Sequence, residues 1–332
     1  MYGISPTIFV VLISCFTTFF NSFTLKDIKM ILKKIAAIDV GSNAVRLLIT
    51  RVIKTRDCRL KLKKELLLRV PLRLGEDSFI KGEISAVLEN RLITAMQTFY
   101  NLIQEYQVET YCAYATAALR EARNGEQIVL DVNQKANIHL RIISGAEEAK
   151  LIVESHAAKK LQAGQNFIYV DVGGGSTEIA LIIHGTLAES KSFRVGTIRL
   201  LNEKVAAAEM DDLLNYLRLI KKKYNPAKIL GLGGNINKVY RLVKTAKKRI
   251  LTVQKLRKIY HKLELLSVEE RMSKYELKPD RADVIVPACE IFLAIAGVTG
   301  ITEIFVPNLK LVDGMTRSIL EAEKSPDSVT SL

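Results

Sequence analysis

The sequence predicts an α/β protein built from two duplicated domains with a cleft between them. Its 332 residues, 48% of them apolar, are enough for two domains of about 100 to 200 residues each. Two similar strand-turn-strand units, IAAIDVGSN around Asp39 and IYVDVGGGSTE around Asp171, begin the two halves. Their shared context predicts an internal duplication.

The first half is expected to open with a hairpin. Ile35 to Asp39 has the pattern of a buried strand, 40–43 of a turn, and Val45 to Ile53 of a second strand. Because this glycine turn leads into a strand, neither a dinucleotide-binding motif nor a GK[ST] phosphate loop is present. Apolar residues at helical spacing predict a helix over 84–106, and a strand is expected over 110–115.

The junction of the halves and the second hairpin have equally clear signals. A strand is expected over 138–143, and Ser144 and Glu147 form a capping box that starts a helix through Lys160. The second hairpin consists of three segments: a strand over 167–171, a turn over 173–176 and a strand over 178–183.

A third glycine turn differs from the other two because it leads from a strand into a helix. The turn covers 231–235, after an apolar stretch over 228–232 and before apolar residues at helical spacing. The remaining expected elements are helices over 252–278 and 281–296, a strand over 303–306 and a helix over 314–322.

These elements predict the domain organisation. Domain I covers 30–145 and is rejoined by a C-terminal helix over 314–328, whereas domain II covers 146–313. Residues 1–29 form an apolar extension that fits neither a signal peptide nor a spanning helix, so we expect translation to begin at Met30. The alternative is a membrane anchor or an export signal.

Charge and cysteine content narrow the class of protein. The net charge of +14 favours an acidic partner, and nucleic acid, anionic lipid and inorganic phosphate chains all meet that requirement. The four cysteines are scattered without a CxxC pair, which supports neither a zinc site nor a disulfide framework and fits the cytoplasm.

The first turn offers groups suited to phosphate. Gly41 allows close backbone approach, Ser42 and Asn43 supply a hydroxyl and an amide, and Asp39 can hold a metal ion or its waters. An ordinary hairpin turn is the alternative interpretation, because the same residue types are common in turns.

The second and third turns extend this pattern. Three consecutive glycines, Gly173, Gly174 and Gly175, expose backbone N–H groups beside Ser176, at an entropic cost that a simple hairpin does not require. In the third turn the N-terminus of a helix can hold an anion or a nucleotide phosphate. Its candidate residues are Gly231, Gly233, Gly234 and Asn235.

Two acidic groups must flank a phosphate that water attacks, and Glu148 and Glu178 are the candidates. The spacing from Ser144 gives Glu147 the capping role and leaves Glu148 free to point into the cleft. Arg120 is a candidate bidentate phosphate clamp, although a surface salt bridge is an equally ordinary use of an arginine.

Taken together, these segments resemble the exopolyphosphatase and guanosine pentaphosphate phosphatase (Ppx/GppA) family in its short two-domain form. The resemblance covers about Ile35 to Gly314. It rests on AIDVGSNAVRLLI, ATAALREARN, IISGAEEAKLI, VDVGGGSTEIAL, FRVGTIRL, GLGGN and DRADVIVPACEIF, in that order.

The resemblance implies a fold, a reaction and a set of roles. The family has two actin-like (ribonuclease H-like) ATPase-superfamily domains, and it uses Mg²⁺ to release orthophosphate from polyphosphate or guanosine pentaphosphate. By match to its motifs, the first and second turns and Arg120 bind phosphate, and Glu148 is the general base. Glu178 places the water, and Asp39, Asp171 and Glu178 are the expected metal ligands.

The leading hypothesis is therefore an exopolyphosphatase. The alternatives are a guanosine pentaphosphate 5′-phosphohydrolase, a nucleotide-gated actin-like binding protein, and an enzyme that transfers phosphate to ADP. The resemblance also implies a homodimer. No nucleic-acid partner is expected, and no membrane partner is expected unless the N-terminal segment is real. Long members carry an added C-terminal helical domain beyond the stretch that matches Gly314, so short substrates are favoured. Ala44 also replaces a hydroxyl residue that is frequent in the family.

Overall fold

The structure is a computed structural model that describes residues 30–55, 59–154, 166–243, 249–307 and 310–322. The predicted extension 1–29 and the last residues of the predicted helix 314–328 lie outside this range. The chain forms two compact units, Met1–Lys33 with Arg51–Lys63, and Lys34–Thr50 with Lys64–Leu332. In the first unit the amide and the hydroxyl of Thr55 both donate to the Arg59 carbonyl, at 2.9 and 2.8 Å. Everything below on the site concerns the second unit, and the predicted domain boundary near residue 145 stays a prediction.

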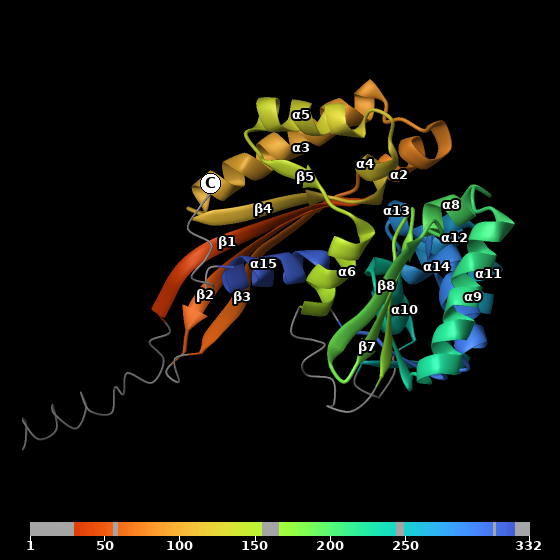
Figure 1. The fold of residues 1–332 in the computed structure, drawn as a ribbon. Coiled ribbons are helices and arrows are strands. Elements are labelled where there is room, and N and C mark those ends of the chain that lie inside the picture. Colours follow the sequence, from red (N-terminus) through yellow and green to blue (C-terminus); the bar gives the residue numbers. More distant parts are fainter. Residues whose placement is uncertain (1–29, 56–58, 155–165, 244–248, 308–309, 323–332) are drawn as a thin grey trace, which may run out of the picture. The chain divides into compact units, whose positions relative to one another are not determined.

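Two mixed β-sheets form the framework (Figure 1). The first has the strand order β3-β2-β1-β4-β5 and the second the order β10-β11-β9-β6-β7-β8. The strands of the first are β1 (Met30–Val40), β2 (Val45–Lys54), β3 (Leu60–Val70), β4 (Thr110–Ala115) and β5 (Leu140–Ile142). Those of the second are β6 (Phe167–Val172), β7 (Thr177–Ile183), β8 (Thr186–Phe193), β9 (Lys228–Leu232), β10 (Ile250–Thr252) and β11 (Glu303–Phe305).

The helices lie in the connections between strands. They are α2 (Leu74–Glu76), the π-helical turn η1 (Asp77–Lys81), α3 (Ala86–Glu105), α4 (Ala117–Glu121), α5 (Gly125–Ala136), α6 (Gly145–Glu154), α8 (Thr197–Leu201), α9 (Ala207–Tyr224), α10 (Gly234–Leu242), α11 (Val253–Glu264), α12 (Val268–Tyr275), α13 (Pro279–Ala282), α14 (Ile285–Thr299) and α15 (Leu311–Ala322).

The predicted duplication is confirmed by the topology. Read from its other edge, the first five strands of the second sheet run β8-β7-β6-β9-β11, which matches β3-β2-β1-β4-β5, and β10 is an added sixth strand beside β11. In both sheets a hairpin comes first, and its first strand then pairs in parallel with the strand that follows the next helical segment: β1 with β4, and β6 with β9. The glycine turn therefore occupies the same place in each half.

Side chains alternate between the two faces of each strand, and the buried ones form three layers. Side chains of β1 at Ala36 and Ile38 pack with α3 and α5, whereas Ala37 faces the opposite side, where α15 lies (Figure 1). In β6, Ile168 and Val170 likewise pack in the layer that contains α9, α10, α11 and α14. The other face of β6 carries Tyr169, in the same layer as Ala37 and α15.

Helix α14 is a core helix, although its length and apolar composition resemble those of a membrane span. The stretch over 279–299 has the length and apolarity of a membrane span, but 67% of it is buried within the protein. Its side chains at Phe292, Ile295 and Cys289 pack in the layer of the second sheet. Burial of most of its side chains therefore explains its largely apolar composition.

Most predicted elements are confirmed, and the differences have local causes. The Ser144–Glu147 capping box is present, with reciprocal hydrogen bonds of 2.9 and 3.1 Å. The predicted helix over 252–278 is broken into α11 and α12, because the Ser267 side chain caps a new helix. Beyond Glu154 the predicted helix to Lys160 lies outside the described residues.

The helix α8 places a glycine in direct contact with another turn, which gives a test of the fold. A Cβ at Gly196 would lie 2.4 Å from the backbone of Gly174 and Gly175. We expect Gly196→Ala to lower the free energy of unfolding by roughly 1 to 3 kcal/mol, because backbone atoms must move to admit the methyl group. Urea unfolding measures the change.

The matched control for Gly196→Ala is Gly297→Ala. Gly297 is exposed on α14, and a Cβ there meets nothing within 4 Å. The control is expected to be neutral or to stabilise the protein by up to about 1 kcal/mol, because alanine favours helix. Equal effects of the two substitutions would contradict this packing.

Candidate active site

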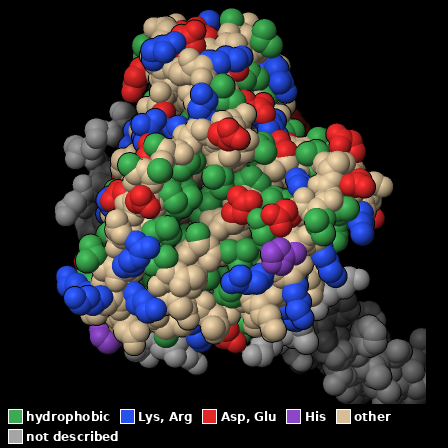
Figure 2. Space-filling view, turned by 90° about the vertical axis from the view of Figure 1, so that its right-hand side faces the viewer, with side chains coloured by type: hydrophobic (Ala, Val, Ile, Leu, Met, Phe, Trp, Pro, Cys, Tyr) green, Lys and Arg blue, Asp and Glu red, His purple; other side chains and the backbone are tan. Residues whose placement is uncertain are grey.

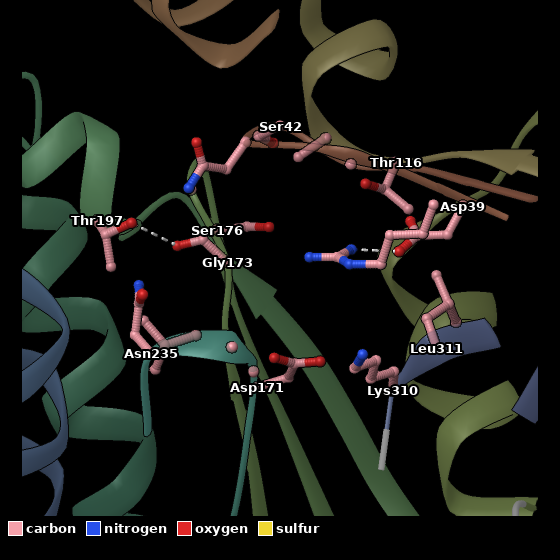
Figure 3. Close-up of a pocket in the computed structure, with 18 of the residues that line it drawn as sticks. Asp39, Ser42, Thr116, Asp171, Gly173, Ser176, Thr197, Asn235, Lys310 and Leu311 are labelled. Atoms are coloured by element: carbon pink, nitrogen blue, oxygen red, sulfur yellow. Dashed lines mark hydrogen bonds and ion pairs between the residues drawn. The ribbon is translucent and has the colours of Figure 1, made fainter. Parts of the chain in front are cut away.

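One cavity of about 300 Å³ brings the three glycine turns together (Figure 3). Its walls include residues of the first turn (41–44), the second turn (173–176) and the third turn (231–235). Figure 3 shows Ser42 and Ser176 in the upper part of the pocket. The side chains of Asp171 and Lys310 point into the space below them. We call this cavity the pocket.

In the first turn the backbone carbonyls are occupied. The turn is closed by a 3.2 Å hydrogen bond from the Gly41 amide to the Ala44 carbonyl. The Gly75 amide donates to the Ser42 carbonyl at 2.8 Å, and the Arg73 amide donates to the Asn43 carbonyl at 3.2 Å. Within the described chain, the amides of Ser42 and Asn43 donate to no partner.

The second turn repeats this arrangement. The Gly173 amide closes it by donating to the Ser176 carbonyl at 2.9 Å. Residues of α8 then hold its three glycine carbonyls: the Thr197 amide donates to Gly173 at 3.0 Å, and the Ile198 amide donates to Gly174 at 2.8 Å. The guanidinium of Arg199 donates to Gly175 at 2.9 Å.

These carbonyl contacts orient the amides of both turns. In a trans peptide the C=O of one residue and the N–H of the next point in opposite directions. The held carbonyls of Ser42 and of residues 173–175 therefore turn the amides of Asn43 and of residues 174–176 toward the pocket, and the amides of Gly174, Gly175 and Ser176 have no acceptor among the described residues. Converging free amides form an anion-binding site. We call these two sets of amides the cradle.

The two turns are also in contact with each other. A Cβ at Gly174 would lie 2.9 Å from the Ser42 Cβ, and one at Gly175 would enter the Phe79 ring at 2.1 Å. Only glycine fits at these positions without a shift of its neighbours. The second half of the cradle thus needs its glycines for close approach.

Four carboxylates gather on the opposite side of the pocket. Asp39 follows Ala37 on one face of β1, and Asp171 follows Tyr169 on one face of β6. Glu178 pairs with Asp171 across the β6–β7 ladder, so it shares that face. Glu148 comes from the first turn of α6 and completes the pocket wall.

Burial raises the pKa values of three of these carboxyls, Glu148, Asp171 and Glu178. Burial raises the pKa of Glu148 well above its ordinary range, and the charges of Glu178 and Asp171 raise it further. The pKa of Asp171 is raised to about 7 by burial and by Glu178. Burial also raises the pKa of Glu178, although hydrogen bonds from Ser176 (2.5 Å) and Ser192 (3.1 Å) oppose the shift.

Glu148 has one carboxylate oxygen without a hydrogen bond. Its Oε2 is buried and accepts no hydrogen bond, with Arg120 Nη1 at 3.9 Å. A carboxylate with a raised pKa and an open oxygen beside a pocket is suited to accept a proton near neutral pH. This is the geometry of a general base.

Five cations complete the pocket wall. Arg46 pairs with Asp39 at 2.5 Å, and Arg69 pairs with Asp280. The other three, Arg241, Arg281 and Lys310, form no ion pair with any residue that the structure describes. Burial and neighbouring arginines lower the pKa of Arg281 to about 10, and burial and nearby cations lower that of Lys310 to about 8. An anionic ligand relieves such repulsion.

The structure brings most of the predicted site residues to the pocket. Those that line it are Asp39, Gly41, Ser42, Asn43, Glu148, Asp171, Gly173, Gly174, Ser176, Glu178, Gly233, Gly234 and Asn235. The side-chain amide of Asn43 donates to the Asp280 carbonyl at 2.8 Å, which leaves its backbone amide as the group for phosphate.

Three predicted residues lie outside the pocket lining. Arg120 donates to the Ile143 carbonyl at 2.9 Å and is not among the lining residues, and its role as a phosphate clamp stays a prediction. Gly175 packs under Phe79 and contributes its amide only. A Cβ at Gly231 would meet Ile304 at 2.7 Å, so this glycine serves packing within the second sheet.

Sequence reasoning missed the five pocket cations. Arg46 had a usable signal: it alternates with the buried Val45 and Leu47 directly after the first turn. Arg281 lies in the DRAD segment and Lys310 in a connection, and neither has a local pattern that separates it from a surface residue. Figure 2 shows that many other Lys and Arg side chains are interspersed with acidic ones on the face it presents.

The carboxylates fit a cation that shares its coordination with a ligand. Among the described residues, no three His, Cys, Asp or Glu side chains converge closely enough to hold a metal ion by themselves. Mg²⁺ ordinarily takes one or two carboxylates together with waters and substrate phosphates. The repulsion within the cluster and the open oxygen of Glu148 agree with that mode of binding.

Comparisons with known proteins agree on one family. The model of the Ppx/GppA phosphatase family matches residues 66–323. Exopolyphosphatase 2 of Mycobacterium tuberculosis is 31% identical over 208 residues, which are 60% of this chain and 64% of that protein. A guanosine-5′-triphosphate,3′-diphosphate pyrophosphatase of Aeromonas hydrophila is 28% identical over 177 residues, covering 53% of this chain and 34% of that protein.

A solved structure supports the same assignment. The crystal structure of the Aquifex aeolicus Ppx/GppA family member is 25% identical, with a TM-score of 0.70 over 88% of this chain and 99% of that one. The expected α/β fold class with two duplicated halves agrees with this match and with the paired strand orders.

The buried carboxylates predict a specific dependence of stability on pH. The pKa of Asp171 rises from 3.8 to about 7 on folding, so between these values the folded state holds a proton that the unfolded state releases. Stability from this group is present below pH 4 and is lost as pH rises toward 7. Asp171→Asn is therefore expected to raise the free energy of unfolding at pH 8 by on the order of 2 kcal/mol.

Unfolding in the presence of a chelator, at pH 5 and pH 8, measures the effect. Asp211→Asn, on the exposed side of α9, removes a charge without touching the cluster and is expected to change little at either pH. A variant at Asp171 that is destabilised at pH 8 would contradict the repulsion described above.

Proposed function

The chain belongs to the Ppx/GppA phosphatase family, and we propose that it is an exopolyphosphatase, a phosphohydrolase that releases the terminal orthophosphate of inorganic polyphosphate. One observation carries this proposal: the cradle of free amides and Glu148, a carboxylate with a buried oxygen that accepts no hydrogen bond, belong to one pocket. The first feature binds a phosphate, and the second accepts the proton of a water that attacks it.

Binding would begin with the terminal phosphate in the cradle. Five amides, from Ser42, Asn43 and residues 174–176, have no acceptor within the described chain and can donate to its oxygens. Amides held by their own carbonyl contacts need no rearrangement when charge develops on the phosphate. Arg241, Arg281 and Lys310 then offer charge to the next phosphates of the chain.

Hydrolysis would follow by in-line attack of water. Glu148 takes a proton from the water, whose oxygen forms a bond to the terminal phosphorus. The bond from phosphorus to the bridging oxygen breaks, and the shortened chain leaves with the electron pair. Glu178, fixed by Ser176 and Ser192, is placed to orient that water.

Mg²⁺ is the proposed cofactor, with Asp39, Asp171 and Glu178 as the residues that would hold it. When bound, the ion supplies positive charge that neutralises the phosphate oxygens and the leaving chain. The bound ion would also relieve the repulsion by Glu178 that helps to raise the pKa of Asp171.

Guanosine pentaphosphate is the alternative substrate within the same chemistry. The third turn lies in the pocket, where Arg281 donates to Asn235 Oδ1 at 3.4 Å. A phosphate chain that carries guanosine would find an anion-binding subsite there. A cytoplasmic location and a homodimer remain part of the proposal by family resemblance.

Phosphate release tests the proposed function. We expect the purified protein with Mg²⁺ to release orthophosphate from tripolyphosphate and longer polyphosphate faster than from guanosine pentaphosphate, and to stop when a chelator is added. Faster release from guanosine pentaphosphate would establish the alternative. No release from any of the three would contradict a phosphohydrolase and favour a binding protein.

Glu148→Gln tests the assigned base. Removing the proton acceptor is expected to lower kcat about 100- to 10,000-fold, because general base catalysis contributes that much. Glu147→Gln is the matched control, since Glu147 caps α6 and pairs with Arg141 at 2.9 Å, away from the pocket lining. Its kcat should stay within a few-fold of the wild type. Equal losses in the two variants would refute the assignment.

A further inference from the structure

Arg199 is a buried cation behind the second turn. It is 4% exposed, lies in α8 and is not among the residues that line the pocket. Its Nε donates to the Gly175 carbonyl at 2.9 Å, and its Nη2 pairs with Glu121. The centre of the Phe79 ring is 4.3 Å from the guanidinium carbon.

These contacts fix the guanidinium from three sides. A buried charge is costly unless it is paired and hydrogen-bonded, and Glu121 supplies the opposite charge. Phe79 packs on the guanidinium and on Gly175 at once, because a Cβ at Gly175 would enter its ring. Arg199 therefore has little freedom to release the Gly175 carbonyl.

The Gly175 carbonyl has a direct bearing on the cradle. It belongs to the same peptide plane as the Ser176 amide, so its direction sets the direction of that N–H. The Gly173 and Gly174 carbonyls are held by backbone amides of Thr197 and Ile198, whereas the Gly175 carbonyl is held by a side chain. A substitution can therefore remove this one anchor and leave the other two.

Glu121 connects this anchor to the base. It is the last residue of α4, and its neighbour Arg120 lies 3.9 Å from Glu148 Oε2. One short helix thus contacts both the guanidinium that holds the second turn and the carboxylate proposed as the base.

We propose that Arg199 is a positioning residue of the phosphate cradle, which holds the Gly175 carbonyl so that the Ser176 amide points at the bound phosphate. The proposal rests on the proposed function for its catalytic consequence, but not for its effect on anion binding. Glu121 and Phe79 keep the guanidinium in place.

Arg199→Lys tests the proposal, because lysine keeps the charge beside Glu121 but lacks the fork that reaches both partners. The readouts are the dissociation constant of orthophosphate, kcat and KM for tripolyphosphate, and the melting temperature. We expect orthophosphate to bind about 10-fold more weakly. We expect kcat to fall about 10- to 100-fold, with a smaller change in KM, because an oriented amide matters most in the transition state.

Arg194→Lys is the matched control. Arg194 pairs with the same Glu121 oxygen at 3.2 Å, but it is 62% exposed and donates no bond to the second turn. It should leave orthophosphate binding and kcat unchanged within about two-fold. A merely structural role of Arg199 would lower the melting temperature and leave kcat and orthophosphate binding of the folded protein as in the wild type, which would overturn the proposal.

A second variant keeps the test decisive if Arg199→Lys does not fold. Glu121→Gln leaves Arg199 in place but weakens its pairing, and a smaller loss in the same direction is expected. Wild-type kcat and orthophosphate binding in Glu121→Gln would then overturn the proposal.

Orthophosphate binding separates this inference from the proposed function. If the wild type binds orthophosphate but releases none from tripolyphosphate, the proposed function fails, and the binding constants still decide the role of Arg199. If the wild type binds no orthophosphate, the cradle is wrong and this proposal fails with it.

Discussion

The site depends on one constraint, the planarity of the trans peptide. In both glycine turns the carbonyls are held on the outside, by amides of residues 73 and 75 in one case and by α8 in the other. The amides of Asn43 and of residues 174–176, which follow held carbonyls, then face the pocket. Close packing of Gly174 on Ser42 and of Gly175 on Phe79 also fixes the second turn, because a side chain at either glycine would displace its neighbour. It also explains why short elements such as α2 and α8 matter for function.

The pocket contains a group of carboxylates and a group of cations, and each group is stabilised by a ligand of the opposite charge. Strand alternation places Asp39, Asp171 and Glu178 on the faces that meet α6, where burial raises the pKa values of Asp171 and Glu178 and repulsion by Glu178 raises that of Asp171 further. Arg241, Arg281 and Lys310 gather in the same pocket without ion pairs inside the described chain. Both groups raise the free energy of the ligand-free protein. A phosphate chain with a divalent cation neutralises both, so binding specificity and the instability of the empty site have the same origin.

Sequence reasoning reached the parts of this arrangement that local patterns encode. The hairpins around residues 40 and 172, the duplication, the Ser144–Glu147 box and the resulting freedom of Glu148 all follow from spacing. Features set by long-range packing did not follow from it. Arg199 in FRVGTIRL, the burial of Gly231 under Ile304 and the displacement of Arg120 from the pocket depend on which element packs against which. Strand β3, the basic stretch over 60–70, was not predicted, because its side chains do not alternate between a buried and an exposed face.

Amide hydrogen exchange tests the central claim most directly. Glu148→Gln protein, in which the substrate should persist, is compared with and without tripolyphosphate and Mg²⁺. The account predicts that the amides of residues 42–43 and 174–176 become protected together, over the same range of substrate concentration, because both turns hold one phosphate. Protection of one turn without the other, or of neither, would contradict it.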